Sequence, residues 1–314
     1  MKDRYKKVAL FGIGTIGAGL AAYFALKGIE VYVYARSDRG KARLAAVIDT
    51  YRNLGIIDEN TDLAALVHFS ADPKEVFSDV YFVQESATED IEEKRVNIAL
   101  MEEYLPAEAI IASSSSGIPV TVMAEGAKHP ERIIVAHPFN PAYLLPLMEL
   151  CGGEQTTQEV LDEAVEFYKA CGKVPVVMKK EKAGFIANRL AHAVWREEVA
   201  MVAEGVCTLE DADNALCFGP GLRWAAFGPA MNYELGGSED GLKGIIEKFG
   251  STSDRIFADL SNMAKTPDGF ANTAGEQMPE YIEKLPEHVG HTRGDIAAFR
   301  DGLIVELLKM HNKF

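Results

Sequence analysis

Short apolar runs alternate with longer stretches of mixed polarity through the first part of this chain. Lys7–Phe11 and Ile29–Ala35 are apolar runs of strand length, and Gly28 ends the small, apolar stretch Gly14–Lys27 between them. Short runs bounded by glycine are typical of buried strands, and small apolar residues suit a helix that packs closely on a sheet. The pattern predicts a β-α-β unit at the N-terminus.

The same alternation continues as far as Lys182. Two helices are clear between the apolar runs, over Asp90–Tyr104 and Gln158–Cys171. Further strands are expected over Val67–Ser70, Val80–Glu85, Ile110–Ser113, Arg132–Ala136, Leu147–Cys151 and Val174–Lys179. Strands that alternate with helices favour a Rossmann-type α/β fold, with a mainly parallel sheet and helices on both faces.

The pattern of hydrophobic and polar positions changes after Lys182. From Gly184 onward helical patterns follow one another and strand patterns are almost absent. We therefore expect a dinucleotide-binding Rossmann domain over residues 1–182 and an all-α C-terminal domain over residues 183–314. A chain of 314 residues is long enough for two cores. The C-terminal domain would contact substrate and form a homodimer, with the twofold contact in its apolar stretch Ala187–Val206.

Three glycines follow the first strand in the spacing G-x-G-x-x-G. Gly12 permits a tight turn, Gly14 lets the backbone approach a pyrophosphate, and Gly17 lets helix and strand pack closely. The N–H groups at the start of the helix, at Thr15 and Ile16, would then face phosphate oxygens. Because a strand precedes this motif and a helix and a second strand follow it, we predict dinucleotide binding. The alternative is a glycine turn in an unrelated α/β protein.

The residues after the second strand bear on the type of cofactor. NAD enzymes usually have an acidic residue there, which binds the ribose hydroxyls, whereas this chain has Ala35 followed by Arg36 and Ser37. Arg36 could pair with a 2′-phosphate, and Ser37 could donate to it. NADP(H) is therefore favoured, and NAD(H) remains possible. In the alternative, Arg36 is solvated or stacks on adenine, and Asp38 binds the ribose.

Composition and charge exclude some classes of partner. The formal net charge of −15 repels phosphate backbones and anionic lipid, so we expect neither nucleic acid nor a membrane surface as a partner. No apolar run approaches the ~20 residues of a membrane span, and we expect no signal peptide before the first strand. The cysteines form no CxxC pair and are expected to be reduced, as in a cytoplasmic protein. They are Cys151, Cys171, Cys207 and Cys217.

A histidine and a carboxylate provide candidate proton-transfer chemistry. His137 precedes Pro138, and Glu149 follows in an apolar run, where a carboxylate needs a partner. A histidine can exchange a proton near neutral pH, and a carboxylate can hold its other ring nitrogen. With the dinucleotide loop and the hydroxyl cluster Ser113–Ser116, this pair suggests hydride transfer coupled to proton transfer on an alcohol or ketone. In the alternative, His137 is a structural turn residue and Ser116 caps a helix or turn.

Three features of the chain resemble the L-3-hydroxyacyl-CoA dehydrogenase superfamily. They are Ala136–Pro141, Glu149 twelve residues past His137, and Gly184–Leu190. The finer pattern is similar to the branch of L-carnitine dehydrogenase and L-gulonate 3-dehydrogenase, the lens lambda-crystallin relative. The stretches that carry this finer resemblance are Gln84–Ser86, Ser113–Gly117, His137–Pro141 with Tyr143–Leu147, and Gly219–Trp224.

The resemblance implies catalytic roles for four residues. His137 would be the general base in alcohol oxidation and the general acid in ketone reduction, and Glu149 would hold and polarise it. Ser116 would lie beside the substrate oxygen, and Asn188 would contact the reacting site. A hydroxyl and an amide can also stabilise a developing oxyanion. In the alternative, Asn188 caps or bridges helices.

The resemblance also implies binding residues. Glu89 and Lys94 align with residues at the nicotinamide half of the cofactor, and we expect Asn140 to contact the substrate. Arg223 could bind a carboxylate bidentately, and Trp224 could face a trimethylammonium group through cation–π attraction. In the alternative, both side chains pack where a helix meets a turn.

The substrate is expected to be a small free 3-hydroxy acid. Family members that use acyl-CoA carry a lysine-rich helical hairpin after the second strand, whereas Ala45–Leu66 is short, poor in lysine and partly acidic. The alternatives are an L-3-hydroxyacyl-CoA dehydrogenase and, in another class, a nucleotide-binding protein without catalysis. We expect no metal site, because His288 and His291 lack Cys or carboxylate partners at ligand spacing.

Overall fold

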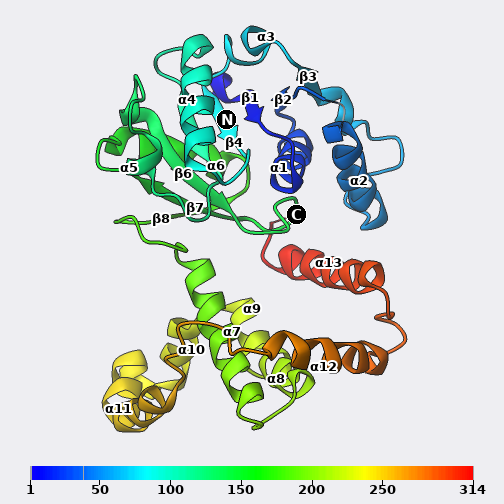
Figure 1. Cartoon of the computed structure of the whole chain (residues 1–314), viewed down its shortest axis with the longest axis vertical. Helices are drawn as coiled ribbons and strands as arrows, with labels where there is room; N and C mark the ends of the chain where they lie inside the picture. Colours follow the sequence, from blue (N-terminus) through cyan, green and yellow to red (C-terminus); the bar gives the residue numbers. More distant parts are fainter. Residues whose placement is uncertain (1, 38, 314) are drawn as a thin grey trace. The chain divides into compact units, whose positions relative to one another are not determined.

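One eight-stranded sheet organises the N-terminal part of the computed structural model, which describes residues 2–37 and 39–313 (Figure 1). The strands lie in the order β3-β2-β1-β4-β5-β6-β7-β8; β6 and β7 are antiparallel, and the other neighbours are parallel. Their bounds are β1 (Lys7–Phe11), β2 (Glu30–Tyr34), β3 (Val67–Ser70), β4 (Phe82–Glu85), β5 (Ile110–Ser113), β6 (Ile133–Pro138), β7 (Leu147–Gly152) and β8 (Val174–Val177). The chain crosses from β3, at one end of this order, back to β4 beside β1, as is typical of a Rossmann fold, so the predicted fold class is confirmed.

Helices cover both faces of this sheet. On one face, α1 and α6 contribute Leu20 and Phe167 to an apolar core. On the other face, α4 and α5 contribute Met101 and Met123 to a second core. The helical elements here are η1 (Asp3–Tyr5), α1 (Thr15–Leu26), α2 (Arg39–Asn53), η2 (Leu63–Leu66), α3 (Pro73–Phe77), α4 (Ile91–Tyr104), α5 (Val120–Met123), η3 (Pro130–Arg132) and α6 (Gln158–Ala170).

Some buried polar side chains gather at one edge of the sheet. Strands covered on both faces are expected to be apolar, and the buried residues of β1 fit this expectation. The buried exceptions are Gln84 and Glu85 at the end of β4, Ser113 at the end of β5, His137 on β6 and Glu149 on β7. Ligands of open α/β sheets bind beyond the carboxyl ends of the parallel strands, so this edge is where a site is expected.

The chain divides into two compact units. The first ends at Asn188 and takes in the chain again from Asp301, and the second is Arg189–Arg300. The predicted division after residue 182 lies slightly earlier and assigns the last helix to the second domain; it stays a prediction.

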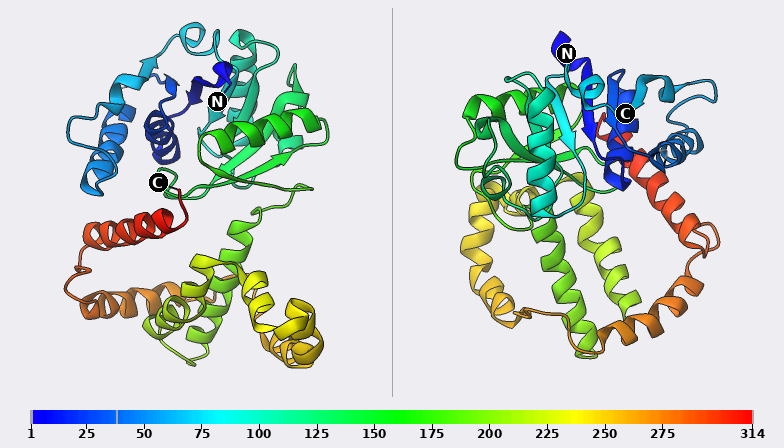
Figure 2. Two further views of the ribbon diagram at one scale, coloured as in Figure 1. Left: turned by 180° about the vertical axis from the view of Figure 1, so that it is seen from behind. Right: turned by 45° about the horizontal axis from the view of Figure 1, so that its top comes forward.

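Residues 189–300 form helices and no strand, which confirms the helical C-terminal region (Figure 2). The helical elements from residue 187 onward are α7 (Ala187–Ala203), α8 (Leu209–Leu216), the π-helix η4 (Cys217–Gly221), α9 (Leu222–Ala226), α10 (Pro229–Gly236), η5 (Ser238–Asp240), α11 (Gly241–Asp259), α12 (Phe270–Lys284) and α13 (Arg293–Met310). A small apolar core contains Val199, Leu209 and Phe270. Within the described ranges, no helix combines the length and the apolar character that a membrane crossing requires.

Candidate active site

The glycine-rich loop places an uncapped helix end at the edge of the sheet. Gly12 has φ +96°, and a Cβ on it would lie 2.8 Å from the carbonyl oxygen of Ser86. A Cβ on Gly17 would lie 2.3 Å from the carbonyl oxygen of Gly12, so both positions require glycine. Gly14 occupies the N-cap position of α1, and no side chain bonds the N–H groups there. A Cβ on Gly14 would have nothing within 4 Å. Open space before free N–H groups fits the pyrophosphate of a dinucleotide.

The end of β2 lies beside this loop in the sheet. Tyr34 is the last residue of β2, and it pairs with Phe11 at the end of β1. Arg36 and Ser37 follow and are exposed, and α2 begins at Arg39. Asp38, which the alternative interpretation assigns to the ribose, lies outside the described residues.

His137 and Glu149 face each other across the antiparallel strands β6 and β7. The two residues are direct register partners, and Nδ1 of His137 lies 3.0 Å from Oε2 of Glu149. Both side chains are buried. The spacing of twelve residues in the sequence is therefore the length of a hairpin that brings base and carboxylate together. With Nδ1–H donated to the carboxylate, Nε2 is the nitrogen left to exchange a proton.

The turn before α7 holds the other oxygen of Glu149. Oε1 accepts the backbone N–H groups of Ile186 and Ala187, each at 2.8 Å. Phe185 has φ +48°, which turns the backbone toward this carboxylate, and its ring stacks on His137 with the centroids 5.1 Å apart. Glu149 is thus fixed at both oxygens. Asn188 comes directly after Ala187 and is half-buried.

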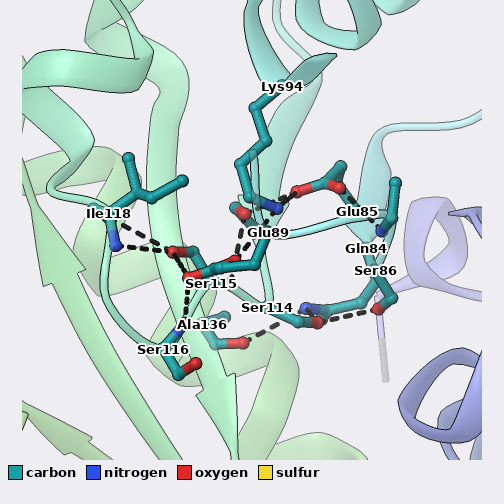
Figure 3. Close-up of polar contacts among 12 residues, drawn as sticks. Gln84, Glu85, Ser86, Glu89, Lys94, Ser114, Ser115, Ser116, Ile118 and Ala136 are labelled. Carbon is teal, nitrogen blue, oxygen red and sulfur yellow. Dashed lines mark hydrogen bonds and ion pairs between the residues drawn. The ribbon is translucent and has the colours of Figure 1, made fainter. Parts of the chain in front are cut away.

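The serine-rich segment after β5 is held by Glu89. Oε1 of Glu89 accepts the Ser115 hydroxyl at 2.6 Å and the backbone N–H groups of Ser116 and Gly117 at 3.0 and 2.9 Å (Figure 3). The Ser116 side chain itself is exposed. Because Ser113 pairs with Val135 two residues before His137, Ser116 and His137 come from neighbouring strand ends.

A buried ion pair lies next to Glu89. Lys94 of α4 donates to Oε2 of Glu85 at 2.8 Å, and both side chains are 1% exposed. Lys94 also lies 3.5 Å from Glu89. Burial raises the pKa of Glu89, but the Ser115 hydroxyl, Lys94 and the two backbone N–H groups outweigh it, so its pKa is lowered. The structure thus assigns Lys94 and Glu89 to one network that ends at Ser116.

Several residues of this network have no role that the sequence alone indicates. Glu85 also accepts the Ser113 hydroxyl and the backbone N–H of Ala87. Gln84 donates to the Ser114 hydroxyl at 2.8 Å and to the carbonyl oxygen before His137 at 3.1 Å (Figure 3). The available signal was two polar residues, Gln84 and Glu85, at the end of an otherwise apolar strand.

The predicted substrate residues lie in different parts of the chain. Asn140 is exposed in the segment between β6 and β7. Arg223 and Trp224 belong to α9 in the second unit and are exposed there. Among residues 2–37 and 39–313, no group of three or more His, Cys, Asp or Glu side chains is arranged to hold a metal ion.

The fold and the site define a dinucleotide-binding Rossmann protein that carries a buried histidine–carboxylate pair. The chain belongs to the 3-hydroxyacyl-CoA dehydrogenase family, because residues 7–182 match the model of the family's NAD binding domain and residues 184–275 match that of its C-terminal domain. The family resemblance seen in the sequence is therefore confirmed.

Relatives of known activity cover nearly the whole chain. L-carnitine dehydrogenase of Streptomyces coelicolor is 35% identical, over 98% of this chain and 95% of that protein. L-carnitine dehydrogenase of Oceanobacillus iheyensis is also 35% identical, with the same coverage. Among solved structures, 5-formyl-3-hydroxy-2-methylpyridine 4-carboxylic acid 5-dehydrogenase, an NAD⁺-dependent dismutase, has a TM-score of 0.78 at 26% identity, over 98% of this chain and 97% of that chain.

Proposed function

We propose that this protein interconverts a small, free L-3-hydroxy acid and its 3-keto acid with a nicotinamide cofactor. The observation that carries the proposal is the contact of 3.0 Å between Nδ1 of His137 and Glu149, at the edge of the sheet where the glycine-rich loop lies. A nicotinamide cofactor, when bound, accepts or donates the hydride. Gly12, Gly14 and Gly17, with the N–H groups of Thr15 and Ile16, would hold its pyrophosphate.

In the direction of oxidation, Nε2 of His137 takes the proton of the substrate hydroxyl while the hydride leaves C3. Glu149 keeps Nδ1 protonated and stabilises the imidazolium that results. Ser116 and Asn188 donate to the substrate oxygen and stabilise negative charge on it in the direction of reduction. Glu89 and Lys94 would lie at the nicotinamide half of the cofactor when it is bound.

A carnitine-like substrate is favoured by the relatives and by two exposed side chains. The Streptomyces and Oceanobacillus relatives are L-carnitine dehydrogenases. Arg223 would bind the carboxylate of such a substrate, Trp224 would face its trimethylammonium group, and Asn140 is a further proposed substrate contact. The connection from α2 to β3 holds a short turn of 3-10 helix over Leu63–Leu66, which does not suggest a CoA-binding hairpin.

NADP(H) is the cofactor that we propose, with NAD(H) as the alternative. Arg36 and Ser37 are exposed after β2, and Arg39 and Lys41 follow at the start of α2 in a chain of net charge −15. These four residues could pair with or donate to a 2′-phosphate at the adenosine ribose, which supports the proposal.

We further propose that the protein is a cytoplasmic homodimer joined through its C-terminal domain. The four cysteines are free thiols, as expected in a reducing compartment. The second unit exposes many large apolar side chains, which favours burial against a second copy. These include Leu190, Trp195, Phe218, Leu222, Phe227, Leu235, Ile246 and Phe257. Sedimentation velocity tests the dimer, and a monomer at micromolar concentration would refute it.

A substrate panel tests the proposed reaction. Carnitine, gulonate, other 3-hydroxy acids and 3-hydroxybutyryl-CoA are assayed with NAD⁺ and NADP⁺. The proposal predicts a higher kcat/KM for at least one free acid than for the thioester. A thioester that exceeds every free acid would instead identify an acyl-CoA dehydrogenase, and absence of turnover with all of them would favour a nucleotide-binding protein without catalysis.

A further inference from the structure

A buried lysine lies directly before β8. Lys173 is 2% exposed, and its Nζ donates to the carbonyl oxygens of Ala142 and Leu145, each at 2.9 Å. Nζ also lies 3.7 Å from the centre of the Tyr23 ring. Two carbonyl dipoles and one aromatic face match the three donors of an ammonium group. Both of these hydrogen bonds therefore go to one short segment of the chain.

That segment, residues 139–146, joins the two strands of the histidine–carboxylate pair. It begins after β6, which carries His137, and ends at β7, which carries Glu149. It contains the exposed Asn140 and forms a turn but no helix or strand. The backbone N–H groups of Leu144 and Leu145 donate to the carbonyl oxygen of Pro141 within the turn, and the remaining contacts come from other elements.

Three neighbouring elements hold the segment. The Tyr51 hydroxyl of α2 donates to the carbonyl oxygen of Tyr143 at 2.7 Å, and the Tyr143 hydroxyl donates to Asp301 of α13 at 2.5 Å. The backbone N–H of Val174, next to Lys173, donates to the carbonyl oxygen of Pro146 at 2.8 Å. Lys173 differs from the other contacts because it binds two points of the turn at once.

We propose that Lys173 is a positioning residue that seats residues 139–146 and so orients Asn140 toward the substrate. The proposal rests on the proposed function, in which Asn140 contacts a 3-hydroxy acid. Lys173 itself is buried, and it acts by fixing the shape of this segment.

The protonation of Lys173 gives this role a pH dependence. Burial lowers the pKa of Lys173 to about 7; nearby Cys171 raises it and Lys27, at the end of α1, lowers it. Burial also raises the pKa of the Cys171 thiol to about 12. Tyr23 of α1 faces the ammonium directly. Titratable groups in contact with the turn from other elements are Tyr51 of α2 and Asp301 of α13, and Tyr143 belongs to the turn itself. Above neutral pH the bonds to the two carbonyls lose their charge assistance and weaken.

The test uses the full-length variants Lys173→Met and Lys173→Gln. Hydrogen exchange of residues 139–146 is measured without cofactor, and kcat and KM for the preferred hydroxy acid are measured from about pH 6 to about pH 9. We expect Lys173→Met to exchange faster in this segment and to raise KM about tenfold, because the binding-competent shape is less populated. Its kcat should stay within about twofold, and the rise of KM with pH in the wild type should be lost.

Two further variants separate positioning from general destabilisation. Lys169→Gln removes an exposed lysine of α6 and should behave as the wild type. Tyr51→Phe removes one uncharged bond to the same turn; it should raise KM less and keep the wild-type pH profile. If Lys173→Met does not fold, Lys173→Gln, which keeps two donors without the charge, takes its place.

The proposal is overturned if exchange in residues 139–146 is unchanged, or if exchange rises while KM and its pH profile do not. A wild-type protein that oxidises no hydroxy acid would refute the proposed function instead. The exchange measurement alone would then decide whether Lys173 holds the segment.

Discussion

At the scale of single residues, the proposed chemistry depends on which nitrogen of His137 is held. Glu149 binds Nδ1, so Nε2 is the basic nitrogen. His137→Ala should therefore lose about 10²- to 10⁴-fold in kcat and keep cofactor affinity. Glu149→Gln should lose less, because the imidazole remains with a weaker partner. Steady-state kinetics and cofactor titration measure both effects, and near-wild-type turnover in His137→Ala would refute the assignment.

The proposed preference for NADP(H) also rests on two residues. Because Ala35 and Arg36 follow β2 where an NAD enzyme usually has an acidic residue, we expect a higher kcat/KM with NADP(H) than with NAD(H). Ala35→Asp combined with Arg36→Ala should reverse the preference, because the new carboxylate accepts from the ribose hydroxyls and repels a phosphate. Added salt should shrink the wild-type preference, since an exposed Arg–phosphate pair is screened. Tighter binding of NAD(H) by the wild type at low salt would contradict this prediction.

Substrate charge can be probed at Arg223. If its guanidinium binds the substrate carboxylate, Arg223→Met should raise KM for a free hydroxy acid far more than for its methyl ester. Charge-assisted hydrogen bonds contribute about 1.5–3 kcal/mol each, which is roughly ten- to a hundredfold in KM. Equal changes for acid and ester would give Arg223 a structural role and would strengthen the acyl-CoA alternative.

At the scale of elements, the pair Lys94–Glu85 ties α4 to the end of β4. Lys94→Met leaves the buried Glu85 carboxylate without its ammonium partner, which should lower the free energy of unfolding by about 3–5 kcal/mol. The double variant Glu85→Gln with Lys94→Met removes both charges and should recover most of this loss. Urea unfolding of the three proteins measures the difference. Equal stability of the single and the double variant would show that the charge of Glu85 is not the cause.

Most strands and turns could be predicted because they depend on residues that are neighbours in the sequence. The apolar runs gave all eight strands, and Gly12, Gly14 and Gly17 gave the turn before α1. His137 and Glu149 could be paired, because a carboxylate in an apolar run needs a partner.

The contacts that complete the site could not be predicted in this way. The N–H groups of Ile186 and Ala187 reach Glu149 from 37 and 38 residues away, and Glu89 reaches Ser116 across 27. Such contacts depend on how the sheet brings distant turns together. Nothing in the sequence indicates that Lys173 is buried, because an isolated lysine before a strand is normally solvated.

At the scale of the whole molecule, Lys173 links stability to pH. The pKa of this group falls from 10.5 in the unfolded chain to about 7 in the folded chain, so between these values the unfolded state binds more protons. Its contribution to the free energy of unfolding therefore rises with pH across this window, by at most about 1.4 kcal/mol per pH unit, and is lost as pH falls through about 7. Urea unfolding at several pH values should show a flatter profile for Lys173→Met than for the wild type. Parallel profiles would contradict the prediction.

The antiparallel pairing of β6 and β7 limits how proteins of this family can evolve in length. One residue inserted into residues 139–146 would turn the side chain of Glu149 to the opposite face of the sheet. Two inserted residues would bring Leu147 opposite His137. The connection from α2 to β3 has no such constraint, because each doubling of a flexible loop costs only about 0.6 kcal/mol. New substrate preferences in this fold are therefore expected to arise through insertions after α2, while the hairpin keeps its length.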